Sequence, residues 1–110
     1  MSAEQNIEKL KIKLPEAKAP VGNYVATKIS GKILFISGQI SIDENAQLIK
    51  GKIGKDLDTE AGYNAAKRCA LSIVAQVKKA CGDDLSKVKS CVKLTGFVNS
   101  TDDFYEQPKV

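Results

Sequence analysis

The alternation of apolar and polar positions in the first third of the chain predicts a β-hairpin. An apolar-rich stretch at residues 24–29 is followed by Ser30, Gly31 and Lys32, and then by a second stretch at residues 33–37. Gly31 can adopt the positive φ that a tight turn needs. We therefore predict two antiparallel strands joined at this turn.

The second predicted strand has four consecutive apolar residues, which run from Ile33 to Ile36. Because strand side chains alternate, Leu34 and Ile36 point to one face and Ile33 and Phe35 to the other. Both faces then require burial. A helix can cover one face, and we expect a second subunit to cover the other. The alternative is a sandwich closed within one chain, which would need more strands than the pattern supplies.

A long helix is predicted at residues 59–80, with Asp58 or Thr59 as its cap and Gly82 just after its end. The predicted apolar side carries Ala66, Cys69, Ala70, Ile73, Val77 and Ala80. The side expected to face solvent carries Lys67, Arg68, Gln76, Lys78 and Lys79.

The other segments give weaker patterns. Residues 1–13 could form a short helix or fray, and residues 46–50 a short third strand. Residues 14–20 carry two prolines and predict an extended lead-in to the hairpin. The stretch 51–55 has glycine and lysine as phosphate-binding loops do, but it lacks the Walker spacing, so we expect a flexible connection. A further strand is predicted at residues 90–98. Residues 99–104 resemble the start of a second helix, capped by Ser100 or Thr101. The order of elements predicts an α+β fold.

Composition narrows the chemistry that the chain can perform. It has 110 residues, 43% hydrophobic and 27% charged, which suits one globular domain. The absence of histidine excludes imidazole acid–base catalysis and Ser-His or Cys-His nucleophiles. Cys69, Cys81 and Cys91 are widely spaced, so we expect reduced thiols, no metal site and no cofactor.

Charge and hydropathy bear on partners and location. The formal charge is +4, but the lysines are scattered and form no block interleaved with aromatic residues, so we expect no nucleic-acid partner. We see neither a secretory signal nor an apolar run that would span a membrane. We therefore expect a cytoplasmic protein without membrane contact.

Several motifs resemble the RidA/YjgF family of reactive-intermediate deaminases, also called endoribonuclease L-PSP-like. In that family a Gly-x-Tyr precedes a strand and a G-x-x-x-F-x-S-G-Q-I strand follows, and this chain carries VGNY at 21–24 and GKILFISGQI at 31–40. The helix, the strand VKLTGFVN at 92–99 and DF at 103–104 follow in the family's order. LPE at 14–16 and GFVNS at 96–100 are similar to a longer subgroup.

The resemblance implies a fold of the Bacillus chorismate mutase type, with a mixed sheet and one long helix packed on one face. It implies homotrimers with clefts between subunits, and hydrolysis of enamines and imines such as 2-aminoacrylate to a 2-oxo acid and ammonia. Residues 1–13 would be an N-terminal extension and residues 14–110 the RidA-like domain.

The resemblance also assigns candidate binding residues. Tyr24 matches a tyrosine that lines the family's cleft, and Ser37, Gly38 and Gln39 match the strand end at the cleft wall. Tyr24 could instead be an aromatic residue packed at the hairpin edge. For Ser37, a buried hydroxyl bonded to the backbone is the favoured interpretation.

The family's carboxylate-binding arginine and cleft glutamate lie in two final strands that would follow Val110. We therefore expect the chain to be truncated at its C-terminus, with the second helix and last strands missing, and to be poorly stable alone. The single arginine, Arg68, does not match the family position. The alternatives to a deaminase are a non-catalytic trimer that binds 2-imino or 2-oxo acids and, ranked third, an endoribonuclease.

Overall fold

The computed structural model describes residues 2–110. The chain forms two compact units. The first contains the residues up to Gln39 together with Leu71–Val92, and the second contains Ile40–Ala70 and Lys93–Val110. One long helix runs through both units, and each unit is otherwise described by itself.

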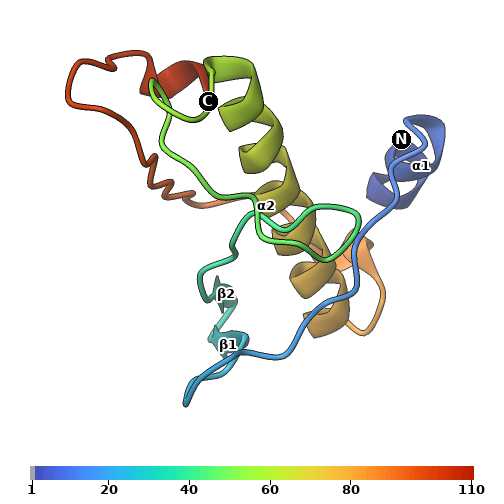
Figure 1. Cartoon of the computed structure of the whole chain (residues 1–110). Helices are drawn as coiled ribbons and strands as arrows, with labels where there is room; N and C mark the ends of the chain where they lie inside the picture. The colour runs from blue at the N-terminus through green and yellow to red at the C-terminus, as the bar shows by residue number, and fades with distance from the viewer. Residues whose placement is uncertain (1) are drawn as a thin grey trace. The chain divides into compact units, whose positions relative to one another are not determined.

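The first unit contains the predicted hairpin (Figure 1). Strands β1 (Thr27–Ser30) and β2 (Ile33–Ile36) pair antiparallel, with Ser30 opposite Ile33, and Gly31 takes a φ of 60° in the turn. The hairpin prediction is confirmed, although β1 is shorter than the predicted stretch 24–29. Tyr24 lies before it, in a bend.

The two faces of β2 differ in burial, whereas the sequence predicts that both require burial. Leu34 and Ile36 are half-buried. Ile33 is 46% exposed and Phe35 57% exposed. Within residues 2–110, the face that carries Ile33 and Phe35 is therefore left uncovered. The sequence predicts a partner for one of the two faces without identifying which one.

The long helix α2 (Thr59–Ala80) has the bounds that the sequence predicts. At its start, Asp58 Oδ1 accepts a hydrogen bond from the Ala61 N–H at 2.8 Å, which satisfies a free donor of the first turn. At its end, the Gly82 N–H donates to the Lys79 carbonyl and the Asp83 N–H to the Lys78 carbonyl. This pair of bonds, with Gly82 at a φ of 65°, is a Schellman motif.

One residue of α2 contradicts the predicted solvent-facing side. Gln76 is 3% exposed, and its Nε2 donates to the Lys18 carbonyl at 2.8 Å. The periodicity of the helix cannot reveal this burial, because the segment that covers Gln76 comes from the distant lead-in. A buried carboxamide is tolerated there because it has a partner.

The N-terminal residues form a helix that contacts the first unit. Helix α1 (Ala3–Lys9) begins with a capping box between Ser2 and Gln5. Glu4 Oε1 accepts a hydrogen bond from the Leu85 N–H at 2.6 Å, where the short 3₁₀-helix η1 (Leu85–Lys87) begins. Leu85 itself is buried. Of the two alternatives left open for residues 1–13, a short helix or a frayed end, the structure shows the helix, and it is tied to the segment that follows α2.

The second unit corrects two expectations. Residues 46–50 form no strand, and one antiparallel bridge joins Ile42 to Leu48. The stretch 51–55, expected as a flexible connection, is held from both sides. The Ile53 N–H donates to the Asn99 carbonyl, the Ile53 carbonyl accepts from the Thr101 N–H, and the Ile53 side chain is buried. Burial of one apolar residue orders this turn.

The strand predicted at residues 90–98 is not formed. Across residues 2–110, no backbone–backbone hydrogen bond involves residues 89–98. Val92, Leu94 and Phe97 are 79%, 72% and 95% exposed. An alternating pattern makes a strand only where a neighbouring backbone supplies hydrogen-bond partners, and the described residues supply no such neighbour here.

The helix start predicted at residues 99–104 is a turn. The Phe104 N–H donates to the Thr101 carbonyl, and the Thr101 hydroxyl donates to the Asp103 carboxylate at 2.6 Å. A short 3₁₀-helix, η2 (Gln107–Lys109), follows. No helix among residues 2–110 has the length and apolarity needed to cross a bilayer.

Candidate functional site

The candidate site lies at the open end of the hairpin, where Ser37 follows β2. The Ser37 N–H and the Ser37 hydroxyl both donate to the Ala26 carbonyl, at 2.9 and 3.2 Å. Ser37 is half-buried. Its proton is therefore already engaged with the backbone, so the side chain closes the end of the sheet and is not poised as a nucleophile.

Gly38 and Gln39 carry polar groups past the strand end. Gln39 Nε2 donates to the carbonyls of Ser37 and Gly38, at 3.1 and 3.2 Å. The backbone N–H groups of Gly38 and Gln39 donate to no acceptor within residues 2–110. Two consecutive N–H groups without partners can bind an anion such as a carboxylate.

Tyr24 lies on the other side of the hairpin end, in a tight bend. The Tyr24 N–H donates to the Gly22 carbonyl at 3.0 Å. Its ring lies over Gly22, so a Cβ on Gly22 would be 3.1 Å from a ring carbon. The side chain is 51% exposed, and its hydroxyl has no hydrogen bond to the described residues. The ring therefore packs locally and leaves the phenol open.

The four residues that the resemblance singles out belong to one end of one hairpin. Tyr24 lies two residues before Ala26, and Ser37 holds the Ala26 carbonyl. The bend at Tyr24 therefore lies two residues before the residue that Ser37 holds. Their free polar groups include a phenol, two backbone N–H groups and the side-chain oxygen of Gln39, which can orient a small polar ligand but supply no strong acid or base.

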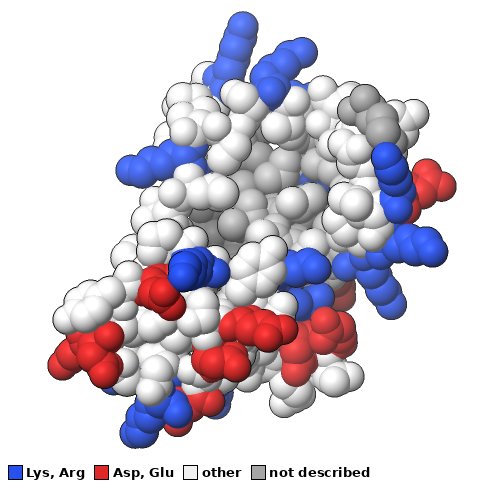
Figure 2. Space-filling model, turned by 90° about the horizontal axis from the view of Figure 1, so that it is seen from above, with Lys and Arg blue, Asp and Glu red and all other residues white. Residues whose placement is uncertain are grey.

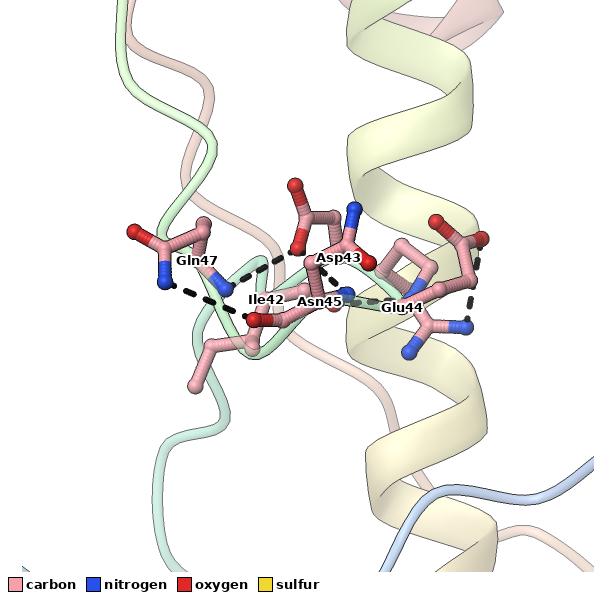
Figure 3. A network of polar contacts seen from close by, with 6 residues as sticks. Ile42, Asp43, Glu44, Asn45 and Gln47 are labelled. Carbon is pink, nitrogen blue, oxygen red and sulfur yellow. Dashed lines mark hydrogen bonds and ion pairs between the residues drawn. The ribbon is translucent and has the colours of Figure 1, made fainter.

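The arginine of the chain is engaged elsewhere, in the second unit. Arg68 Nε donates to the Ile42 carbonyl at 2.7 Å, and Arg68 Nη1 lies 3.6 Å from Glu44 Oε1 (Figure 3). The Arg68 side chain is 15% exposed. The sequence places Arg68 on the solvent-facing side of the helix, whereas the structure shows it fixing the loop that follows Ile42.

That loop is a compact turn with its own polar network. Asp43 Oδ1 accepts hydrogen bonds from the N–H groups of Asn45 and Gln47, both at 2.9 Å (Figure 3). Ala46 takes a φ of 61° between them. The carboxylate stabilises the turn, and Arg68 anchors the turn to α2.

Figure 2 shows the basic and acidic side chains on one face. Lys and Arg side chains stand at several separate places, and Asp and Glu side chains lie on the same face. Single-strand binders instead combine a continuous basic groove with stacking aromatic residues. In the sequence the lysines are scattered and are not interleaved with aromatic residues.

The three cysteines are free thiols. Cys69 and Cys81 are half-buried, and Cys91 is exposed. Burial raises the pKa of the Cys69 thiol above its usual value of 9.0, although a backbone hydrogen bond partly opposes this shift. Cys69 therefore stays protonated near neutral pH and has little nucleophilic character.

A shallow groove of about 420 Å³ lies in the first unit, away from the residues singled out by the sequence. Residues 14–17 form one wall, and residues on or just after α2 form the other, namely Ala75, Lys78, Lys79 and Asp83. The predicted extended conformation of the proline-punctuated lead-in could have suggested a segment lying against a helix. Nothing in the pattern identifies which helix.

Comparison with known proteins gives consistent matches. The sequence model of a family described as "YjgF/chorismate mutase-like, putative endoribonuclease" matches residues 4–110. Protein TCP17 of Trypanosoma cruzi is 44% identical over 105 residues, which are 96% of this chain and 65% of that protein. The chain thus spans a little under two thirds of the length of this curated relative.

Two solved structures resemble the chain closely. Protein Atu1372 of Agrobacterium tumefaciens, a protein of unknown function, is 38% identical with a TM-score of 0.83, over 96% of this chain and 64% of Atu1372. A "putative endoribonuclease" of Shewanella oneidensis MR-1 is 34% identical with a TM-score of 0.92, over 99% of this chain and 72% of its own. The sequence and the backbone of this chain therefore both resemble those of the two proteins over nearly all of its length.

Proposed function

The chain belongs to the YjgF/chorismate mutase-like family, and from this premise we propose that it is a RidA-like protein that hydrolyses reactive enamines and imines. The proposed substrates are of the 2-aminoacrylate type, and the products are a 2-oxo acid and ammonia. The observation that carries the proposal is the hairpin end, where the Tyr24 phenol and the N–H groups of Gly38 and Gln39 have no partners among residues 2–110.

The proposed reaction needs orientation more than strong acid–base catalysis. The enamine first tautomerises to an imine. Water then adds to the imine carbon, the carbon–nitrogen bond breaks, nitrogen leaves as ammonia, and the carbonyl of the 2-oxo acid forms. In this scheme the N–H groups of Gly38 and Gln39 bind the substrate carboxylate, and the Tyr24 hydroxyl orients water or the imine nitrogen. Holding the reactants in place lowers the entropic part of the barrier.

We place this site in a cleft between the subunits of a homotrimer. Ile33 and Phe35, on one face of the hairpin, are 46% and 57% exposed. Exposed apolar groups gathered on one element are typical of protein interfaces. A neighbouring subunit packed there would shield the hairpin from water and could form the second wall of the cleft.

Ammonia release from freshly generated 2-aminoacrylate tests the deaminase proposal. We expect the protein to release ammonia faster than buffer alone, and Tyr24→Phe to lower that rate because the phenol hydroxyl is lost. The Tyr63→Phe variant is a matched control, since Tyr63 is similarly exposed but lies on α2. A rate equal to buffer at high protein concentration would refute the enzymatic function.

The alternative is a non-catalytic trimer that binds 2-oxo or 2-imino acids in the same cleft. The specific observation in its favour is the engagement of Arg68, which leaves this chain without a free guanidinium for a substrate carboxylate. Calorimetric titration with 2-oxobutanoate distinguishes the two functions. Saturable binding without ammonia release supports the binding protein.

Ribonuclease activity is the third candidate, and it rests on the words printed for the family and for the Shewanella relative. The chain has no histidine to serve as an acid or base in phosphodiester cleavage. We expect no cleavage when the purified protein is incubated with a labelled single-stranded RNA.

We further propose that the protein acts in the cytoplasm, without a membrane or nucleic-acid partner.

A further inference from the structure

Gln76 is a polar residue whose burial is explained neither by the hairpin nor by the repeat of the helix. It lies in α2, is 3% exposed, and donates from Nε2 to the Lys18 carbonyl at 2.8 Å, 58 residues away in the sequence. A buried amide is stable only where its hydrogen bonds are made. The contact therefore fixes one point of the lead-in segment against the helix.

A second point of the same segment is fixed further along, at Ala26. The Ala26 carbonyl accepts hydrogen bonds from the Ser37 N–H and the Ser37 hydroxyl. Tyr24 lies between these two anchors, and all the residues involved belong to the first unit. Holding both ends of a segment close to fixed points reduces the conformational freedom of the residues between them.

The lead-in before Lys18 also follows the helix. Residues 14–17 line the shallow groove together with Ala75, Lys78 and Lys79. After Lys18, half-buried Pro20 restricts the backbone, and the Tyr24 N–H closes a tight turn onto Gly22. Tyr24 is thus six residues along the chain from the point where Gln76 holds Lys18.

We propose that Gln76 is a positioning residue that sets the place of Tyr24 at the candidate site. The side chain needs to donate a hydrogen bond, because its partner is a carbonyl oxygen. An effect of Gln76 on activity rests on the proposed function, in which Tyr24 contacts the ligand. The effect of Gln76 on the position of Tyr24 can be tested without any activity.

The substitution Tyr24→Trp provides a probe for the assignment, since the chain contains no other tryptophan. In the Tyr24→Trp protein, we add Gln76→Met, which keeps the side-chain length but removes the donor. We expect the emission of the indole to shift to longer wavelength and its quenching by acrylamide to increase. The measurement is made at a temperature where circular dichroism shows that both proteins are folded.

The matched control is Gln47→Met, the same substitution at an exposed glutamine whose one side-chain hydrogen bond, to Asn45, is long at 3.4 Å. It should leave the emission and the quenching of the indole at position 24 unchanged. An unchanged indole signal in a folded Gln76→Met protein would overturn the assignment. So would an equal change in the control.

A measurement on the unsubstituted protein covers the case in which Gln76→Met does not fold. We expect the side-chain amide protons of Gln76 to exchange with solvent much more slowly than those of Gln47. Rapid exchange at Gln76 would refute the hydrogen bond on which the assignment depends. Both experiments have spectroscopic readouts that need neither activity nor ligand. They therefore test the role of Gln76 even if the protein neither releases ammonia nor binds 2-oxobutanoate.

Discussion

Side chains that join distant parts of the sequence matter most at the residue scale. Gln76 and Arg68 both lie on α2, and each donates to a backbone carbonyl far away in the sequence, at Lys18 and at Ile42. The sequence assigns both to the solvent-facing side of the helix. Their partners, not their positions in the helical repeat, decide their burial.

Arg68→Ala is expected to lower the free energy of unfolding by about 1–3 kcal/mol, because the part-buried hydrogen bond to the Ile42 carbonyl loses its charged donor. The exposed Glu44 contributes little to this loss, since ion pairs with an exposed partner are weak. Urea unfolding measures the difference. The neighbouring exposed Lys67 is the control, and an equal loss in Lys67→Ala would show that the hydrogen bond is not responsible.

Cys69 gives a pH dependence whose sign follows from its surroundings. Burial raises the pKa of its thiol in the folded state above the usual 9.0. As the pH rises past 9.0, the thiol loses its proton in the unfolded chain before it does so in the folded chain, so the folded state becomes less stable. We expect stability to fall above about pH 9, and this fall to be smaller in Cys69→Ala. An identical pH profile in the variant would contradict the prediction.

Asp84 shows the opposite behaviour at acidic pH. Hydrogen bonds from the Ser86 hydroxyl and the Ser86 N–H hold the pKa of its carboxyl below the usual value. The stabilisation is therefore present above the ordinary pKa of aspartate and is lost as the pH falls through the lowered pKa. Because both bonds are exposed and local, the effect is confined to the start of η1.

At the scale of the element, the ends of α2 are set by single residues. Gly82 has a φ of 65°, and the nearest atom to a Cβ built on it is Lys87 Nζ at 3.8 Å. A side chain would therefore fit in the available space but would strain the backbone. The capping of the helix depends on this conformation, since the Gly82 N–H closes onto the Lys79 carbonyl.

Gly82→Ala is expected to destabilise the protein by about 1 kcal/mol, the cost of a left-handed backbone with a Cβ. Gly96→Ala is the matched control, because a Cβ at Gly96 meets nothing within 4 Å and its φ lies outside the left-handed region. Thermal unfolding of the two variants makes the comparison. Equal melting temperatures would argue against the Schellman end of α2.

The elements that depend on local signals could be predicted from the sequence. Residues 59–80 carry a cap at Asp58 and a stop at Gly82, and the hairpin carries its turn at Gly31. The stretch 90–98 also has a strand pattern but forms no strand, because pairing depends on a backbone elsewhere. For the candidate site, the resemblance identified the residues at the hairpin end, whereas the lead-in contact at Gln76 could not be inferred from any local pattern.

At the scale of the whole molecule, apolar side chains are exposed on several segments. Ile53, Ala75 and Leu85 are buried, whereas Phe35 on β2 and Leu94 in the unpaired stretch 89–98 are exposed. Large exposed apolar groups favour association. This is the physical basis for the proposed homotrimer.

Phe35→Glu is expected to dissociate the assembly, because it removes a large apolar contact worth about 1.5–3 kcal/mol and places a charge on that face. Sedimentation velocity measures the change. Leu10→Glu is the control, since Leu10 is 66% exposed but follows α1 and lies outside the hairpin. If the unsubstituted protein sediments as a monomer at high concentration, the trimer is refuted.

The scarcity of buried apolar side chains has a calorimetric consequence. The heat capacity change of unfolding grows with the apolar surface that becomes hydrated when the chain opens. For a solitary chain whose described core consists of Ile53, Ala75 and Leu85, this change would be small for its length. Assembly would transfer much of the exposed apolar surface away from water, so the curvature of the stability curve with temperature would steepen as subunits combine.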